Sequence, residues 1–505
     1  MTRSFVTCVS AAAIAASVPA TPLLAQQPSE RWENWPTSRP PAPLAATDVR
    51  FPLYQRRTLG NGLEVVVVPH HEQPAVTLRL IVRAGAAQDP DGRAGLATLT
   101  AALLDQGTTS RTAEQIQDAI DYVGGGLGTG AGSDLSFVNM VVMKDSLDVA
   151  LDLLSDIVRQ PAFAPEEIDR QRQQVLSSLT VSYKDPEYIA GAVIDRLVYG
   201  FHPYGVPSSG TPESVAAITR ADIVAFHRAW FAPNNAILAI VGDLTAEEAF
   251  AAGERVFGAW SRVEIGARSF PEPPPATRRV VLVDRPGAVQ TEIRIGNIAI
   301  PRGHPDYLAL DLAIRILGGE GSNRLQRVLR SERGLTYGAS ADAQALKQAG
   351  GIVAETDTRS EATGEALRLA VDEFWRLQRE PVGEWELSNA KAYLTGNLPL
   401  TIETPNAIAL QVLNTIFYEL DPKQLDTFRE RVNAITVEDI QRVARAYLRP
   451  SRLSISLVGD ARVIASQLKG VGFDQVEQVP IDELDLSAVD FRHGPKQAPA
   501  GFDGK

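Results

Sequence analysis

The sequence predicts an α+β protein with two duplicated domains, each a largely antiparallel sheet packed against helices, joined by a proline-rich linker. The first observation is length, because 505 residues are too many for one hydrophobic core. The second is an internal repeat with an offset of 217 residues. The third is that strand-like segments stand at both ends of each copy with helix-like segments between them, which is typical of α+β domains.

The repeat is clearest over residues 217–243 and 434–460, where 11 of 27 positions are identical without a gap. In each copy a threonine, Thr219 or Thr436, precedes a helix-like segment with an acidic residue in its first turn, as a helix N-cap does. Solenoid repeats are only about 20–50 residues long, so this longer period indicates duplicated domains.

Strand-like segments occupy corresponding places in the two copies. After the repeated helix come 236–241 and 453–458, and the second of these alternates apolar and polar residues, which predicts a half-buried strand. Earlier strands are expected at 63–68, 75–82, 279–283 and 290–298.

Distinct segments flank and join the domains. The predicted order is a signal peptide at 1–26, a proline-rich arm at 27–49, an N-terminal domain at 50–258, a linker at 259–278, a C-terminal domain at 279–465, and an acidic, then glycine- and proline-rich tail at 466–505. Arg3 and the short apolar run after it predict a secretory signal, with an uncleaved membrane anchor as the alternative. Beyond about residue 472 the tail is expected to be loosely ordered.

Composition narrows the class of protein. A formal charge of −12 argues against nucleic-acid partners, which need a basic surface. The only cysteine, Cys8, lies in the predicted signal, so the mature chain would have no disulfide and no thiol nucleophile. No later segment reaches the length of a membrane helix. These features predict an exported, periplasmic protein, membrane-associated only if the signal is retained.

One helix-like segment, 95–108, has the frame of a zinc-peptidase helix without its zinc ligands. Its sequence G-L-A-T-L-T-A-A-L-L-D-Q-G-T resembles G-L-A-H-x-x-E-H-x-L-x-x-G-T of the pitrilysin and mitochondrial-processing-peptidase family, zinc metallopeptidases also called inverzincins. The histidine places hold Thr98 and Ala102, and the glutamate place holds Ala101. The family's third ligand, a glutamate on a later helix, corresponds to Ser178.

The resemblance extends in order along the chain, through blocks at 58–63, 202–212, 226–236, 317–325 and 329–337. It implies a metallopeptidase-like sandwich in each domain. Because methyl and hydroxyl groups at these places cannot replace the zinc ligands and the general base, the chain itself is expected to bind no cofactor. Zinc is expected in a partner subunit that carries H-x-x-E-H.

The six histidines suggest no other zinc site. His70 and His71 are adjacent in a turn, so their rings are expected to point in different directions. His202 and His227 match family positions that are structural, and are expected to be hydrogen-bonded packing residues.

Arg330 and Tyr337 are the candidate substrate-binding residues. In the family an arginine and a tyrosine at this spacing, with Gly-Leu between them, reach the zinc site of the other domain or subunit and hold the substrate backbone and the oxyanion. Arginine offers a planar fork of donors and tyrosine a hydroxyl donor, which suit that role. The structural alternative is an ion pair for Arg330 and packing for Tyr337.

A glycine-rich segment, 317–324, corresponds to the place where the non-catalytic subunit of the processing peptidase carries a substrate-contacting loop. Its candidate residues are Gly318, Gly319, Gly321 and Ser322. A helix C-cap followed by a turn is an equally good interpretation.

Three functional hypotheses follow. The favoured one is a non-catalytic subunit of an exported zinc metallopeptidase complex, pairing with a homologous H-x-x-E-H chain and binding a peptide or unfolded protein. The second is a scaffold or binding protein of the same fold with no role in proteolysis. The third, an enzyme with different chemistry, has little support because Ser177 and Ser178 have no neighbouring base and no nucleophile elbow.

Overall fold

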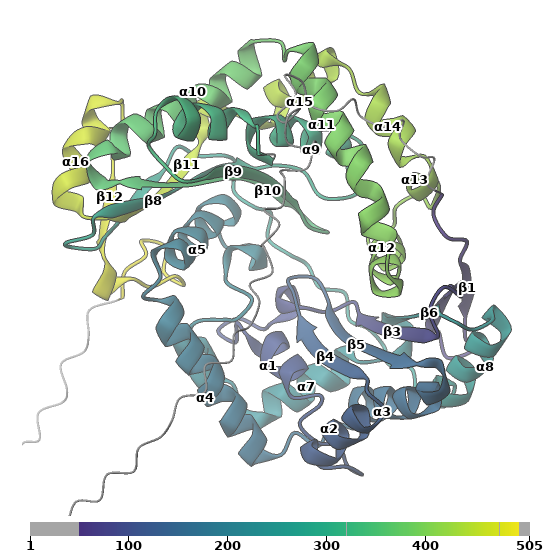
Figure 1. Cartoon of the computed structure of the whole chain (residues 1–505). Coiled ribbons are helices and arrows are strands. Elements are labelled where there is room, and N and C mark those ends of the chain that lie inside the picture. Colours follow the sequence, from purple (N-terminus) through teal and green to yellow (C-terminus); the bar gives the residue numbers. More distant parts are fainter. Residues whose placement is uncertain (1–49, 320, 474, 494–505) are drawn as a thin grey trace, which may run out of the picture. The chain divides into compact units, whose positions relative to one another are not determined.

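The computed structural model describes residues 50–319, 321–473 and 475–493, so the predicted signal, the arm and the end of the tail lie outside the described residues. Two six-stranded sheets form the framework (Figure 1). In spatial order the first sheet contains β1 (Gln55–Thr58), β2 (Glu64–Pro69), β6 (Ala236–Gly242), β3 (Ala75–Val82), β5 (Ser136–Met143) and β4 (Gly126–Ala131). The second contains β12 (Glu477–Pro480), β7 (Val280–Asp284), β11 (Ser454–Gly459), β8 (Gln290–Ile298), β10 (Gly350–Arg359) and β9 (Ala339–Ala345).

Five strands of each sheet share one topology, which confirms the duplication. In each, a central strand (β6 or β11) pairs parallel with one neighbour and antiparallel with the other. The remaining pairs are antiparallel except at one edge, where β1 runs antiparallel to β2 but β12 runs parallel to β7. The strands expected at 63–68, 75–82, 236–241, 279–283, 290–298 and 453–458 are all present to within a residue at each end.

Helices lie between the strands of each copy. In the first half they are α1 (Leu96–Ala102), α2 (Ala113–Tyr122), α3 (Leu147–Arg159), α4 (Pro165–Ser182), α5 (Pro186–Tyr199), α6 (Pro212–Ala217), α7 (Arg220–Trp230) and α8 (Ala246–Phe257). In the second half they are α9 (Tyr307–Ile314), α10 (Thr363–Arg379), α11 (Glu384–Asn397), α12 (Pro405–Phe417), α13 (Lys423–Asp426), α14 (Phe428–Ala434), α15 (Val437–Tyr447) and α16 (Ala461–Gly470). Thr219 and Thr436 accept a bond from the third backbone N–H of α7 and α15, as their sequence predicts.

Both faces of each sheet are buried, and the helix that covers one of these faces comes from the other half. Helices of the same half cover the first face. On the opposite face α5 packs against β8 and β11 of the second sheet, whereas α12 packs against β3 and β6 of the first sheet (Figure 1). The two halves therefore share two of their hydrophobic cores.

This exchange corrects the expectation of a half-buried strand at 453–458. All six residues of β11 are buried, including Ser454 and Ser456, because α5 covers the face on which the polar residues stand. The Ser454 hydroxyl donates to the Thr277 carbonyl at 3.1 Å. A polar residue in a strand was thus a misleading signal for solvent exposure.

The expected loosely ordered tail is wrong for residues 475–493. Strand β12 extends the second sheet, and Val479, Leu484, Leu486 and Phe491 enter the core that contains α5. These apolar side chains alternate with the acidic residues that suggested disorder, so the segment packs its apolar side and exposes Asp482 and Glu483. Among the described residues, no helix has the length and hydropathy needed to cross a membrane.

His202 and His227 are packing residues, as expected. His202 Nδ1 accepts a bond from the Tyr204 N–H at 3.2 Å, and its ring lies against Tyr204 and Phe270. His227 Nε2 lies 2.8 Å from the Val158 carbonyl and its ring stacks on Phe231. Burial lowers the pKa of His227 from 6.5 to about 4, so its neutral form donates this bond.

His227 is expected to make folding sensitive to acid. Its folded pKa of about 4 lies below the unfolded value of 6.5, so its stabilising contribution is complete above pH 6.5 and is lost as pH falls toward 4. Between pH 7 and pH 5 the parent should lose roughly 2 kcal/mol more unfolding free energy than His227→Gln. Urea unfolding at both pH values measures this, with His493→Gln controlling for loss of an imidazole. Equal losses in the parent and His227→Gln would contradict it.

The ordered tail gives a second prediction. Phe491 is 0% exposed, so Phe491→Ala should lower the unfolding free energy by about 3–5 kcal/mol. The matched control is Val489→Ala in the same segment, which should change stability by no more than about 0.5 kcal/mol because Val489 is 65% exposed. If the two variants unfold at the same urea concentration, the tail is not part of the core.

Candidate functional site

The degenerate zinc-site helix α1 is held by its start and by its apolar side. Gly95 caps it with φ of 92°, and a Cβ there would lie 2.8 Å from the Ser209 carbonyl oxygen. The Asp89 carboxylate accepts bonds from the Gly95 and Ala97 N–H groups, both at 2.8 Å. Burial raises the pKa of Asp89 to about 7, although these backbone donors oppose the shift.

None of the four positions that correspond to the zinc site carries a side chain that could coordinate zinc. The Thr98 hydroxyl donates to the Ser208 carbonyl at 2.6 Å. Ala101 is fully buried and Ala102 half-buried. Ser178 is exposed on α4, a helix that contacts α1.

These residues do not fit a zinc ion. Zinc in proteins takes thiolate, imidazole or carboxylate ligands, and none stands at these places. Among the described residues, no group of three or more His, Cys, Asp or Glu side chains is arranged to hold a metal. His70 and His71 diverge as expected, with His71 Nδ1 at 2.6 Å from Asp243 and His70 Nε2 at 3.9 Å from Glu72.

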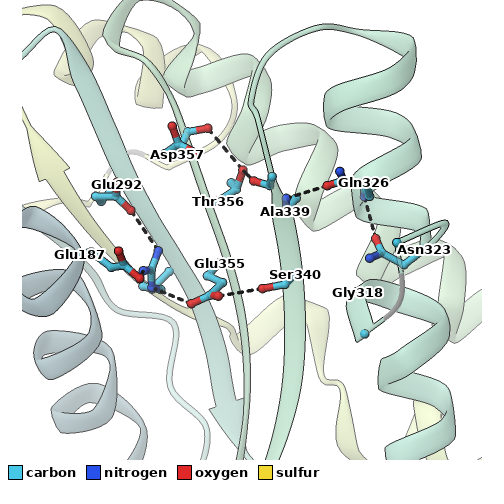
Figure 2. Close-up of a pocket in the computed structure, with 14 residues that line it drawn as sticks. Glu187, Glu292, Gly318, Asn323, Gln326, Ala339, Ser340, Glu355, Thr356 and Asp357 are labelled. Atoms are coloured by element: carbon cyan, nitrogen blue, oxygen red, sulfur yellow. Dashed lines mark hydrogen bonds and ion pairs between the residues drawn. The ribbon is translucent and has the colours of Figure 1, made fainter. Parts of the chain in front are cut away.

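In the second half, the glycine-rich segment lines a pocket of about 500 Å³ (Figure 2). The segment connects two π-helical turns, η6 (Arg315–Gly319) and η7 (Gln326–Glu332). Such turns are frequent at functional sites. Gly318 allows close packing, because a Cβ there would lie 2.2 Å from the Ala341 nitrogen on β9. Gly318, Gly319 and Gly321 line the pocket, whereas Ser322 is exposed and does not.

A buried arginine organises the opposite wall of this pocket. Arg294 on β8 is 5% exposed and its guanidinium lies 3.1 Å from Glu292, 3.4 Å from Glu355 and 3.7 Å from Glu187. Asp357 also lines the pocket, so the lining contains four carboxylates and one cation (Figure 2). This excess of negative charge favours backbone N–H donors and basic side chains over anions.

Arg330 and Tyr337 project from a segment whose base is firmly held. Leu335 between them is buried, donates its N–H to the Leu329 carbonyl at 2.8 Å and accepts a bond from the Thr358 hydroxyl at 2.8 Å. Tyr337 is 85% exposed and Arg330 is also exposed. Within the described parts of the chain, neither side chain has a hydrogen bond, ion pair or ring contact. The alternative of an ion pair for Arg330 and packing for Tyr337 is therefore not what the structure contains.

Arg330 and Tyr337 lie on segments that also contribute lining residues to the pocket. Arg330 shares η7 with the lining residue Gln326, and Tyr337 immediately precedes the lining residue Gly338. The Gln326 side chain accepts a bond from the Ala339 N–H at 3.0 Å, which connects η7 to the start of β9 (Figure 2).

Sequence reasoning missed the charged wall of the pocket. Its members come from three elements: Glu187 from α5, Glu292 and Arg294 from β8, and Glu355 from β10. One signal was present, since Glu292 and Arg294 stand two apart in a strand that was predicted correctly and is otherwise largely apolar. Their partners are distant in sequence and could not be paired without the register that sets Glu355 opposite Arg294.

Comparison with known proteins agrees with this picture. A family model described as insulinase (peptidase family M16) matches residues 64–211, and one described as the peptidase M16 inactive domain matches residues 217–394. An uncharacterized zinc protease of Mycobacterium bovis is 27% identical over 445 residues, covering 86% of this chain and 99% of that protein.

Solved structures give the same result. The crystal structure of a peptidase M16 inactive domain from Pseudomonas fluorescens has a TM-score of 0.76 and 28% identity, covering 81% of this chain and 98% of that one. A protease from Helicobacter pylori has a TM-score of 0.76 at 20% identity, covering 81% of this chain and 100% of that one, which shows the fold alone.

Together with the lost zinc ligands, these matches point to a non-catalytic, peptidase-like chain. The resemblance found in the motifs is confirmed by two family models that between them span most of both halves. The chain belongs to the insulinase or pitrilysin family, peptidase family M16.

Proposed function

We propose that this chain is the substrate-binding, non-catalytic subunit of an exported zinc metallopeptidase, acting with a homologous chain that carries H-x-x-E-H. The observation that supports it most is the contrast between two sites. The zinc-site positions Thr98, Ala101, Ala102 and Ser178 hold no metal ligand. Arg330 and Tyr337 have nevertheless been left exposed and without partners in the described structure, on a rigid base beside a pocket.

The chemistry divides between the two chains. The partner would supply zinc and the general base, which together generate the attacking hydroxide. The guanidinium of Arg330 can bind a substrate carbonyl or a developing oxyanion through its fork of donors, and the Tyr337 hydroxyl can donate to the same oxyanion. The substrate class is a peptide or an unfolded protein, and the carboxylates near Arg294 favour one with basic residues.

The isolated chain is expected to bind less than one zinc ion per molecule and to cleave no peptide, because no group of side chains among the described residues could bind zinc. Metal analysis after dialysis, with a general peptide substrate assayed in parallel, measures both properties. One tightly bound zinc per chain, with peptidase activity lost on chelation, would contradict the proposal.

In the reconstituted pair, Tyr337→Phe should lower turnover roughly a hundred- to a thousandfold, the effect of losing one oxyanion donor. Association of the two chains should be unchanged, because the side chain is 85% exposed and contributes no core volume. The matched control is Tyr122→Phe, at a tyrosine that is 92% exposed in the first half. Turnover is measured with a fluorogenic peptide and association by light scattering.

Arg330→Lys keeps the charge but loses the planar fork, so it should also impair turnover without preventing association. Arg333→Lys is the control, because Arg333 lies three residues after Arg330 but already forms an ion pair, with Glu365 at 3.2 Å. If Tyr337→Phe and Arg330→Lys both assemble and cleave at the parent rate, the scaffold hypothesis becomes the better one.

A further inference from the structure

A second pocket in the second half, of about 300 Å³, shares no lining residue with the pocket beside Arg330. It lies among α9, α11, α12 and α14, and Phe51 closes it from the chain segment before β1. This volume is at the lower end of the range for small-molecule sites. The proposed peptidase function makes no use of it.

Three arginines line this pocket, and one of them is neutralised in place. Arg315 Nε lies 3.1 Å from the carboxylate of Asp311, which also lines the pocket. The other two, Arg302 and Arg431, are half-buried and have no hydrogen bond or ion pair from their guanidinium groups to any described residue. With three arginines and one aspartate, the lining carries an excess of positive charge.

Arg302 and Arg431 line the same pocket, so their charges act on each other. Burial lowers the pKa of Arg431, the charge of Arg302 lowers it further, and Asp421 opposes the shift only in part. The Arg302 guanidinium lies 3.9 Å from the centre of the Tyr307 ring, which fixes its position on the wall. Two like charges held together in a partly buried site are costly unless an anion joins them.

The rest of the lining is suited to a ligand that is only partly charged. Eight aliphatic or phenyl side chains contribute to it: Phe51, Leu308, Leu394, Leu398, Ile402, Leu420, Leu425 and Phe428. Four amides also face it, and within the described residues their side chains have no hydrogen-bond partners: Asn397, Gln411, Asn414 and Gln424. A pocket with a cationic end, free amide donors and an apolar wall matches an anionic head on an apolar body.

We propose that this pocket binds a small organic carboxylate with an apolar body, whose carboxylate lies between Arg302 and Arg431 and whose body packs against Leu394, Leu398 and Leu425. Guanidinium forks bind carboxylates in two parallel bonds, so two arginines can satisfy both oxygens. The site is separate from the proposed peptidase function and stands whether or not that function is correct.

The probe is octanoate, with octanol and inorganic phosphate as comparisons, measured by calorimetric titration of the full chain. Octanoate should bind, and octanol should not, because it lacks the charge. Arg431→Gln and Arg302→Gln should each weaken octanoate binding roughly tenfold to a hundredfold through loss of charge-assisted bonds. The matched control is Arg452→Gln, at an exposed arginine outside the pocket, which should bind as the parent does.

Thermal unfolding without ligand distinguishes a binding role from a structural one. A structural arginine would lower the Tm when replaced, whereas Arg431→Gln should leave it unchanged or raise it, because one of two opposed like charges is removed. Three results would overturn the proposal: no octanoate binding at millimolar concentration, octanoate binding that survives both substitutions, or phosphate binding as tight as octanoate, which would indicate a site for charge alone.

Discussion

The reciprocal packing of α5 and α12 is the interaction on which the rest of this structure depends. The central strands of both sheets are buried on both faces, and each half supplies helices for only one of those faces. The second face is covered by a helix of the other half, through the buried residues of α5 on the second sheet and of α12 on the first. Leaving either face in water would expose many large aliphatic side chains, each worth about 1.5–3 kcal/mol when buried. The pocket beside Arg330 depends on the same exchange, because Glu187 reaches Arg294 only where α5 lies on β8.

Helix α1 keeps the sequence frame of the zinc-site helix although its zinc ligands are absent, because most of the other residues of that frame are buried in the hydrophobic core. Leu96, Leu99, Leu103 and Leu104 are at most 1% exposed, and Asp89 and Gly95 hold the start of α1 through backbone bonds. The ligand positions contribute little to this packing, so threonine and alanine can replace them without disturbing the fold. A family-like sequence pattern is thus evidence for the fold. A catalytic role requires, in addition, that the metal-binding side chains themselves are present.

The two pockets of the second half have opposite electrostatic character. The lining of one contains four carboxylates and a single buried guanidinium group, and the lining of the other contains three guanidinium groups and one carboxylate. A bound anion would relieve the like-charge repulsion in the second, whereas the negative charge of the first is already neutralised in part by its own Arg294. If both proposals hold, the two pockets would select ligands of opposite charge.

Local patterns in the sequence were enough for the duplicated α+β architecture, the caps at Thr219 and Thr436, the six anticipated strands and the absence of zinc ligands on α1. Each of these depends on residues that are neighbours in the chain, where periodicity, capping and motif spacing act directly. Arg330 and Tyr337 were also recognised from a local sequence motif, although the motif did not predict that both side chains are exposed. Tertiary structure alone decided that the serines of β11 are buried, that the acidic tail after 474 packs its apolar side, and that Glu187, Arg294 and Glu355 meet. Those outcomes depend on which face a distant helix covers, and no local pattern carries that information.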